Sequence, residues 1–405
     1  MMNSVTMGAF VLAGSFLSTV GAFQPMNVPE RLSVSVASTR RDFLERVSTT
    51  TAASVAGIAS GLVLPSEESI AASSGPEGSI ELPPMGLGAW AWGDSLFWGY
   101  NPKEDEELRR VFDFAVANSR TPKTLFDTAE LYGLGRSESL LGQFSEECAD
   151  KVQIATKFAA LPFRTKASDV VKACQDSYKR LGNRPIDLYQ IHFPNAWSNA
   201  EYWDGLAMAY DKGLVKAVGV SNYGVDAVRA CHASLAKRGI PLASNQIQLS
   251  LLYKWPLENG LIDTCKELNV DVLSYSPIAL GFLTGKYTEA NPPSGPRKAL
   301  FKQLLTTPDY ANLLETMKGI SASHPGSTLS QVAINWTRAK GTIPIPGART
   351  VKQVQQNYGA LDWTMTPEEV RVLDEASAKV TTFLTPDKGP FPKEDINTKL
   401  HMFDS

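Results

Sequence analysis

From residue 81 onward, short apolar runs rich in β-branched residues alternate with amphipathic stretches of ten to fifteen residues. Such alternation predicts a parallel sheet whose strands are connected by helices. The expected strands are residues 85–92, 124–128, 152–157, 186–192, 217–221, 243–247, 270–276 and 342–346. The expected helices include residues 104–118, 168–181, 201–212, 225–238 and 256–268. Eight strand–helix units in about 280 residues fit an α/β fold of one domain, a (β/α)8 TIM barrel.

A doubly wound open sheet is the alternative, and a dinucleotide-binding version would need GxGxxG between its first strand and first helix. Residues 86–91 (GLGAWA) fit the relaxed GxGxxA form. An aromatic loop follows them, however, and the next helical pattern starts only near Glu104. We therefore interpret this match as chance and favour the barrel.

The first eighty residues have a different composition from the rest of the chain. Residues 7–23 are uncharged and have the length of the apolar region of a signal peptide. A second uncharged segment, residues 47–66, follows the pair Arg40-Arg41, which resembles a twin-arginine signal. Its low hydrophobicity argues against a stable membrane span in the mature protein.

Two targeting signals in tandem suggest passage across more than one membrane. The sequence AFQP at 22–25 resembles the Ala-Phe-x-Pro boundary of secondary-plastid presequences. We therefore expect residues 1–80 to be a bipartite targeting presequence, removed to about residue 72, and residues 81–405 to be the barrel with a C-terminal extension. The destination would be a plastid (chloroplast), in the stroma or the thylakoid lumen. One ordinary signal peptide followed by a linker is the alternative.

Charge and cysteine content exclude some classes of function. Lys+Arg is 39 and Asp+Glu is 42, a balance that argues against a nucleic-acid binder. The four cysteines are scattered without a CxxC pair, so neither a disulfide framework nor a metal site is expected. They are interpreted as buried thiols: Cys148, Cys174, Cys231 and Cys265.

Polar residues end three consecutive expected strands. Asp127, Lys157 and His192 each close an apolar run, and Tyr132 follows Asp127 by five residues. Since the carboxyl ends of barrel strands meet at one mouth, these residues are expected to lie together. A Lys ammonium would lower the pKa of the tyrosine, Asp would hold the lysine, and His would orient a substrate oxygen. This group suits reversible proton transfer to a carbonyl oxygen.

Several segments resemble one family throughout residues 82–375. They are FDTAELYG (126–133), TKF (156–158), LYQIHFP (188–194), GVSNYG (219–224), NQIQLS (245–250), SYSPIALGFLTGKY (274–287) and IPGARTVKQVQQN (345–357). They resemble the aldo-keto reductases. The segments KFAALPFR (157–164) and NPPSGPR (291–297) are similar to plastid-type members of plants and algae.

The resemblance implies roles for individual residues. Tyr132 would be the general acid for carbonyl reduction, tuned by Asp127 and Lys157, and His192 would orient the carbonyl. Ser221, Asn222, Gln246 and Tyr275 would contact the nicotinamide. The residues implied along the pyrophosphate are Ser276, Pro277, Ile278, Leu280 and Gly281, and those at the adenosine end are Gly347, Arg349, Gln353, Gln356 and Asn357.

Many family members have Arg or Lys where this chain has Gln353 or Gly347. Arg349 could still pair with a 2′-phosphate, so NADPH is favoured over NADH. In the family, a loop corresponding to the insert at about 278–324 folds over the bound dinucleotide. The alternative is that this insert is an ordinary surface loop.

The expected substrate is a small carbonyl compound in an apolar pocket lined by Trp92, Phe158, Phe193 and Trp197. Trp90 is expected to be core. NADPH-dependent reduction of an aldehyde or ketone is the function favoured, and a slow or inactive redox-sensing subunit that binds nicotinamide is the alternative. A lyase with Lys157 as Schiff base is disfavoured because Asp127 is its neighbour. The sequence fixes neither the physiological substrate nor the oligomeric state.

Overall fold

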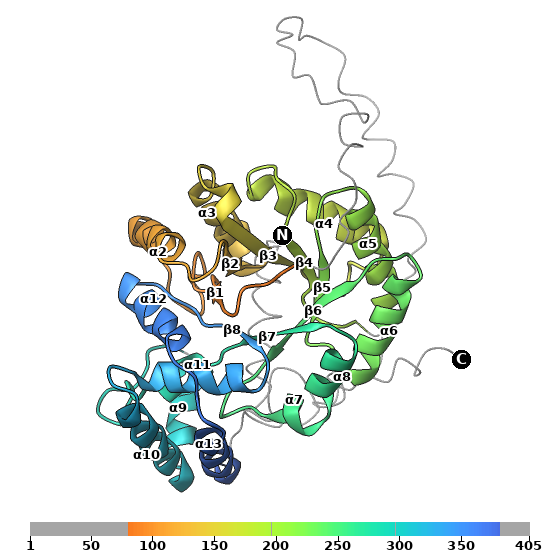
Figure 1. Cartoon of the computed structure of the whole chain (residues 1–405). Helices are drawn as coiled ribbons and strands as arrows, with labels where there is room; N and C mark the ends of the chain where they lie inside the picture. Colours follow the sequence, from red (N-terminus) through yellow and green to blue (C-terminus); the bar gives the residue numbers. More distant parts are fainter. Residues whose placement is uncertain (1–79, 196, 296, 381–405) are drawn as a thin grey trace, which may run out of the picture. The chain divides into compact units, whose positions relative to one another are not determined.

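The eight expected strands form one parallel sheet in sequence order, in a computed structural model that describes residues 80–195, 197–295 and 297–380. The strands are β1 (Gly86–Gly88), β2 (Thr124–Asp127), β3 (Val152–Phe158), β4 (Leu188–Ile191), β5 (Val218–Ser221), β6 (Leu242–Gln248), β7 (Asp271–Tyr275) and β8 (Ile343–Ile345). Gly88 donates its N–H to Pro346 O at 3.1 Å and pairs with Gly347, which brings β1 against the end of β8. The predicted (β/α)8 barrel is thereby confirmed (Figure 1).

The helices surround the strands in a ring (Figure 1). Those that follow successive strands are α2 (Asp105–Ala117), α3 (Arg136–Phe144), α4 (Ala167–Arg180), α5 (Asn199–Asp211), α6 (Val225–Ala236), α8 (Leu261–Glu267), α11 (Leu329–Ala339) and α12 (Val351–Tyr358). Gly182 and Gly213, which follow α4 and α5, have φ of 88° and 67°. Glycine adopts this left-handed conformation without a Cβ clash, which suits it to end a helix.

Two expectations about helices were incomplete. The helix expected over 256–268 is divided into α7 (Trp255–Glu258) and α8, with Gly260 at φ 78° between them. The insert at 278–324 is largely helical: it contains the 3-10 segment η5 (Ala279–Thr284), α9 (Arg297–Leu305) and α10 (Pro308–Ser323). A further helix, α13 (Pro367–Lys379), packs against α10.

The barrel core has an inner and an outer layer because successive strand residues face opposite sides. Leu125, Ala155 and Leu188 belong to the inner cluster, whereas their neighbours Phe126, Ile154 and Tyr189 belong to the cluster that includes the surrounding helices. Asp127 and Lys157 lie two residues beyond Leu125 and Ala155 on the same strands. The alternation therefore turns these two polar side chains into the barrel at its carboxyl end.

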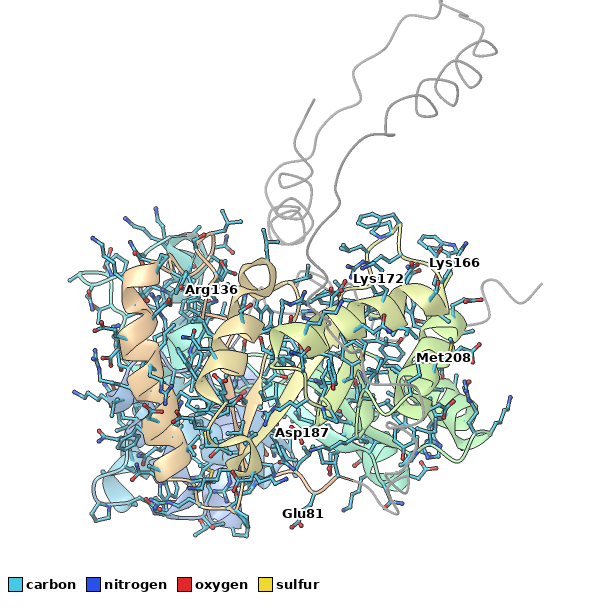
Figure 2. All side chains as sticks on the ribbon, turned by 90° about the horizontal axis from the view of Figure 1, so that it is seen from above. Glu81, Arg136, Lys166, Lys172, Asp187 and Met208 are labelled. Atoms are coloured by element: carbon cyan, nitrogen blue, oxygen red, sulfur yellow. The ribbon has the colours of Figure 1, made fainter. Side chains whose placement is uncertain are left out.

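The opposite end of the barrel is covered by the first described residues. Ile80 and Leu82 pack against the inner cluster, and Glu81 O accepts a 2.9 Å hydrogen bond from Gln153 Nε2. Figure 2 shows the barrel from the side, with Glu81 and Asp187 near one end and Arg136 and Lys166 near the other. Residues 80–82 thus lie at the end away from the carboxyl ends of the strands.

The expected presequence, residues 1–80, falls almost entirely outside the described residues, as does the chain beyond Val380. Within the described part, no helix has the length and apolar character needed to cross a membrane. The same part contains no group of three or more His, Cys, Asp or Glu side chains arranged to hold a metal. Cys174, Cys231 and Cys265 are buried, Cys148 is half-buried, and all four are free thiols.

Candidate active site

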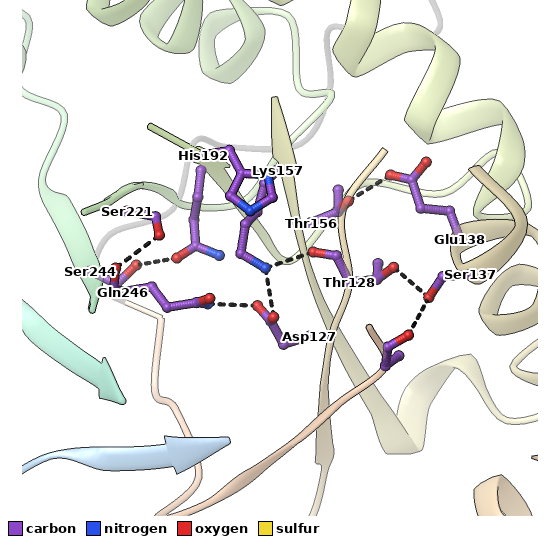
Figure 3. Close-up of polar contacts among 12 residues, drawn as sticks. Asp127, Thr128, Ser137, Glu138, Thr156, Lys157, His192, Ser221, Ser244 and Gln246 are labelled. Atoms are coloured by element: carbon purple, nitrogen blue, oxygen red, sulfur yellow. Dashed lines mark hydrogen bonds and ion pairs between the residues drawn. The ribbon is translucent and has the colours of Figure 1, made fainter. Parts of the chain in front are cut away.

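A buried ion pair lies at the carboxyl end of β2 and β3 (Figure 3). Lys157 Nζ is 2.6 Å from Asp127 Oδ1 and donates a second hydrogen bond of 2.8 Å to Thr128 O. The side chains of Lys157 and Asp127 are 0% and 3% exposed. A buried charge without a partner is very costly, so each of these groups depends on the other for its charged form.

Tyr132 is held above this pair by the close approach of two loops. Gly133, with φ 58°, lies so near Gly93 that a Cβ on it would be 2.4 Å from Gly93 O. Glycine is therefore required there, and the loop after β2 is fixed against the loop after β1. Lys157 Nζ lies 5.1 Å from the centroid of the Tyr132 ring, and the Trp90 ring lies 6.2 Å from it.

His192 directly follows β4 and faces Tyr132, with ring centroids 5.8 Å apart and planes at 78°. Its backbone is held on both sides: His192 N donates to Phe158 O at 2.9 Å, and Asn222 Nδ2 donates to His192 O at 3.1 Å. Its ring atom Nδ1 is buried without a hydrogen-bond partner in the described residues. The ring is thus positioned by its backbone and by packing on Phe193 at 4.2 Å.

Burial controls the ionisation of these groups. It raises the pKa of Tyr132 well above the ordinary 10.0, with a further increase from the Asp127 charge. It lowers the pKa of His192 well below 6.5, assisted by the Lys157 charge, so the imidazole is neutral at neutral pH. The pKa of Lys157 is also lowered by burial, although Asp127 opposes the shift.

The sequence-based expectation for the tyrosine was therefore wrong in direction. We expected Lys157 to lower the pKa of Tyr132, but the net shift is upward. The physical reason is that desolvation of the buried phenol is the dominant effect on its pKa, and the negative charge of Asp127 adds to it. The Tyr132 hydroxyl therefore carries its proton at neutral pH.

Four residues expected at the nicotinamide form one hydrogen-bonded group beside this pair. Tyr275 Oη donates to Asn222 Oδ1 at 2.9 Å, and Ser221 Oγ donates to Gln246 O at 2.8 Å. Asn222 Nδ2 is 3.1 Å from Ser221 Oγ, and Asn222 has a φ of 62°. Gln246 Nε2 donates to Asp127 Oδ2 at 2.7 Å (Figure 3). The group therefore adjoins the Asp127–Lys157 pair directly.

Sequence comparison assigns this barrel to a family. Residues 84–378 match the profile of the aldo/keto reductase family, a stretch that contains all eight strands and Asp127, Tyr132, Lys157 and His192. The chain belongs to the aldo-keto reductase family. The predicted resemblance is thus confirmed, and the chain is an oxidoreductase.

Individual relatives agree with this assignment. The chain is 43% identical over 318 residues to a protein named pyridoxal reductase, chloroplastic, from Arabidopsis thaliana, covering 74% of this chain and 84% of that protein. It is 29% identical over 311 residues to a probable aldo-keto reductase 1 from Glycine max, covering 73% and 86%. A thermostable aldo-keto reductase crystallised with the inhibitor epalrestat superimposes with a TM-score of 0.60 at 25% identity, covering 75% of this chain and 98% of that one.

In this aldo-keto reductase, the expected pyrophosphate segment has an unusual backbone. Ser276 has a φ of 54°, and the consecutive residues Ala279, Leu280 and Gly281 have φ of 49°, 56° and 93°. Non-glycine residues rarely adopt this conformation, and they cluster at ligand sites when they do. Pro277 and Ile278 complete the same turn after β7.

The residues expected at the adenosine end lie together after β8. Asn357 Nδ2 donates to Gly347 O at 3.4 Å, and Arg349 N donates to the Gln353 side chain at 2.7 Å. Gln356 is half-buried on the same helix, α12. The Arg349 side chain, which was expected to be available to a phosphate, instead pairs with Glu104 and donates from Nη1 to Trp98 O at 2.8 Å.

The structure corrects two of the pocket residues. Trp92 is 1% exposed, packs on Phe126 in the outer core, and donates from Nε1 to Ala348 O at 2.7 Å. Phe158 is fully buried against Tyr202 of α5. Phe158 alternates with Lys157 on β3 and therefore faces the outer layer, whereas Trp92 is held in the outer core by its contacts with Phe126 and Ala348. Phe193 and Trp197 lie after β4, on the loop next to His192, and Trp197 is 78% exposed.

Two features of the mouth were missed. Trp90 was expected to be core, but its ring lies against Tyr132 and Phe97, and its Nε1 donates to Asp94 at 3.0 Å. Arg297 lies 4.8 Å from the Trp98 ring, and its Nε is buried without a hydrogen-bond partner in the described residues. No local pattern marks Arg297, since it is separated from β7 by more than twenty residues. The contact between Arg297 and Trp98 therefore joins the insert after β7 to the loop after β1.

Proposed function

We propose that this protein reduces a small aldehyde or ketone to the corresponding alcohol with NADPH as the reductant. The observation that carries the proposal is the buried Asp127–Lys157 pair with Tyr132 and His192 above it at one mouth. These are the residue types needed to bind a carbonyl oxygen and give it a proton. The bound dinucleotide would supply the hydride.

Each residue has a role that follows from its ionisation. Tyr132 keeps its proton at neutral pH because burial raises the pKa of its hydroxyl, and it donates that proton to the carbonyl oxygen. His192 is neutral and donates a ring N–H to the same oxygen, which fixes its direction. Lys157, paired with Asp127, keeps a positive charge near the oxygen as negative charge develops.

The described residues fit a dinucleotide. Gln246, Asn222 and Ser221 supply amide and hydroxyl partners for a carboxamide, and Tyr275 offers an aromatic face. The left-handed backbone at 279–281 would hold the pyrophosphate, and Arg349 would reach the 2′-phosphate of NADPH. The chain binds NADH less tightly on this proposal, because NADH lacks that phosphate.

Pyridoxal is the first substrate to test, since the chloroplastic relative from Arabidopsis thaliana is named for its reduction. Purified protein should consume NADPH with pyridoxal or with another member of an aldehyde and ketone panel. The alternative, a redox-sensing subunit, predicts tight NADPH binding with no turnover on any member of the panel. That result would contradict the proposed enzyme and favour the sensor.

We also propose that the protein is delivered to a plastid by residues 1–80. The support is the pair of uncharged segments at 7–23 and 47–66 and the chloroplastic relative. Within the described residues, Ile80 and Leu82 pack on the inner cluster ahead of β1. Fractionation of intact plastids, with separate stromal and lumenal fractions, tests the destination.

A further inference from the structure

The Arg349 guanidinium is already occupied at both of its terminal nitrogens. Nη2 forms an ion pair with Glu104, and Nη1 donates to Trp98 O at 2.8 Å. Glu104 ends the 3-10 segment η2 (Pro102–Glu104) immediately before α2. The two charged side chains are 29% and 33% exposed, so the pair is neither fully buried nor fully hydrated. A phosphate that approaches Arg349 therefore meets a carboxylate already bound there.

Within the described part of the chain, Glu104 forms no ion pair other than that with Arg349. The neighbouring carboxylate Asp105 is committed to Arg136, and Glu107 is committed to Arg110. The first turn of α2 also carries Asp105, Glu106 and Glu107, so its negative charge surrounds Glu104. A phosphate bound to Arg349 would be repelled by the Glu104 carboxylate, because both anions would contact the same guanidinium.

We propose that Glu104 sets the preference between NADPH and NADH by competing with the 2′-phosphate for Arg349. The inference rests on the proposed function, in which Arg349 binds that phosphate. Carboxylate and phosphate both match the planar guanidinium fork, so they are direct competitors for its N–H groups. NADH has no 2′-phosphate and does not meet this competition. Glu104 therefore weakens NADPH binding selectively, and the preference for NADPH is lower than Arg349 alone would give.

The test is Glu104→Gln, which keeps the size of the side chain and an oxygen that can accept from Arg349 but removes the charge. Fluorescence titration of NADPH and NADH, without substrate, measures both affinities directly. We expect NADPH to bind roughly three- to tenfold more tightly, from the loss of a half-exposed ion pair and of like-charge repulsion. The NADH affinity should stay within about twofold. The gain should shrink as salt is raised, because exposed charges are screened.

Glu106→Gln is the matched control. Glu106 lies in the same first turn of α2 and is exposed, and the change removes the same charge two residues away. It should leave the ratio of NADPH to NADH affinity unchanged. An equal gain in Glu106→Gln would mean that overall charge, not competition at Arg349, is responsible, and would overturn the inference.

Arg349→Met tests whether Arg349 binds the 2′-phosphate, separately from whether Glu104 competes for Arg349. If Arg349→Met weakens NADPH selectively and Glu104→Gln gives no gain, the inference is wrong while the role of Arg349 stands. If Arg349→Met weakens NADPH and NADH equally, the role of Arg349 is wrong and the inference falls with it. In the double variant, the Glu104→Gln gain should disappear, because it acts through Arg349. A weaker NADPH affinity in Glu104→Gln would show that Glu104 organises Arg349 rather than competes for it.

Discussion

Gln246 donates a 2.7 Å hydrogen bond from Nε2 to Oδ2 of Asp127, while the other oxygen of the same carboxylate accepts from Lys157 at 2.6 Å. Asp127 therefore uses one oxygen for the catalytic lysine and the other for a residue of the proposed nicotinamide site. Gln246 and Asp127 are each 2% exposed, so water does not readily replace either contact. The Asp127 carboxylate therefore links Lys157 to the proposed nicotinamide site.

Gln246→Leu should destabilise the protein even without cofactor, because it leaves one oxygen of a buried carboxylate without its donor. The expected loss is about 1–3 kcal/mol in the free energy of unfolding, measured by urea denaturation. Gln190→Leu is the control: Gln190 is also fully buried in the barrel, but its Nε2 has no hydrogen-bond partner in the described residues, and its Oε1 accepts only a long 3.4 Å hydrogen bond from Ser244 Oγ. Equal losses in the two variants would argue against a specific role for the bond to Asp127.

Tyr132→Phe should abolish nearly all reductase activity and leave NADPH binding within a few-fold. The change removes only the hydroxyl that is proposed to donate the proton, and it keeps the ring that packs on Trp90 and lies beside Lys157. General acid catalysis is typically worth ~10²–10⁴ in rate. The measurement is kcat with the best aldehyde of the panel, paired with a cofactor titration. Near-normal kcat would rule out Tyr132 as the acid.

Strand order and the catalytic group follow from sequence, and the reason is periodicity. The alternation of strand residues directs Asp127 and Lys157 into the barrel, and the parallel sheet brings consecutive strand ends to one mouth. Trp92 and Phe158 could not be placed from their residue type, because an aromatic side chain suits a pocket and an outer core equally well. Their burial against Phe126 and Tyr202 is decided by packing between strands and helices.

Long-range partners were the other information that the sequence lacked. Arg349 and Glu104 are 245 positions apart, and no local pattern links them. The same holds for Arg297 and Trp98, which meet because the insert after β7 reaches the loop after β1. The direction of the Tyr132 pKa shift depended on how deeply the phenol is buried, which only the packing around it decides.

The pH dependence of carbonyl reduction should be flat across the neutral range. Burial raises the pKa of Tyr132 above 10.0, so the donor keeps its proton well into alkaline solution. Burial lowers the pKa of His192 below 6.5, so the imidazole stays neutral in mildly acidic solution. We expect kcat for reduction to vary less than about threefold between roughly pH 6.5 and pH 9. An inflection near pH 7 in kcat would contradict the neutral His192.

The same shift in His192 has a consequence for stability. The pKa of His192 is lower in the folded chain than in the unfolded chain, so the unfolded state takes up a proton first as the pH falls. The stabilisation is complete above the ordinary pKa of 6.5 and is lost progressively below it. His192→Gln should remove this part of the pH dependence, and unfolding free energies measured at several pH values would reveal it.

Arg349→Ala should weaken NADPH binding more than NADH binding. Its guanidinium is the group proposed to bind the 2′-phosphate, and a charged hydrogen bond to phosphate is worth ~1.5–3 kcal/mol. Because Glu104 competes for Arg349, we expect the loss of NADPH affinity to lie near the lower end of this range, about tenfold. Lys352, which is exposed in the first turn of α12, is the control site, and Lys352→Ala should change the ratio of affinities less. Equal losses for both cofactors in Arg349→Ala would show that Arg349 does not bind this phosphate.

Processing of the chain should end before Ile80. Ile80 and Leu82 pack on the inner cluster at the end of the barrel away from the mouth, and Glu81 O accepts from Gln153. A variant that begins at residue 73 keeps these contacts and should match the full chain in kcat and in urea denaturation. A variant that begins at residue 84 loses them and should be less stable by about 2–4 kcal/mol, from two partly buried aliphatic side chains and one hydrogen bond. N-terminal sequencing of the native protein gives the actual start. A native start beyond residue 82 in an active, stable protein would show that this cover is dispensable, and a start at Met1 would contradict the removal of a presequence.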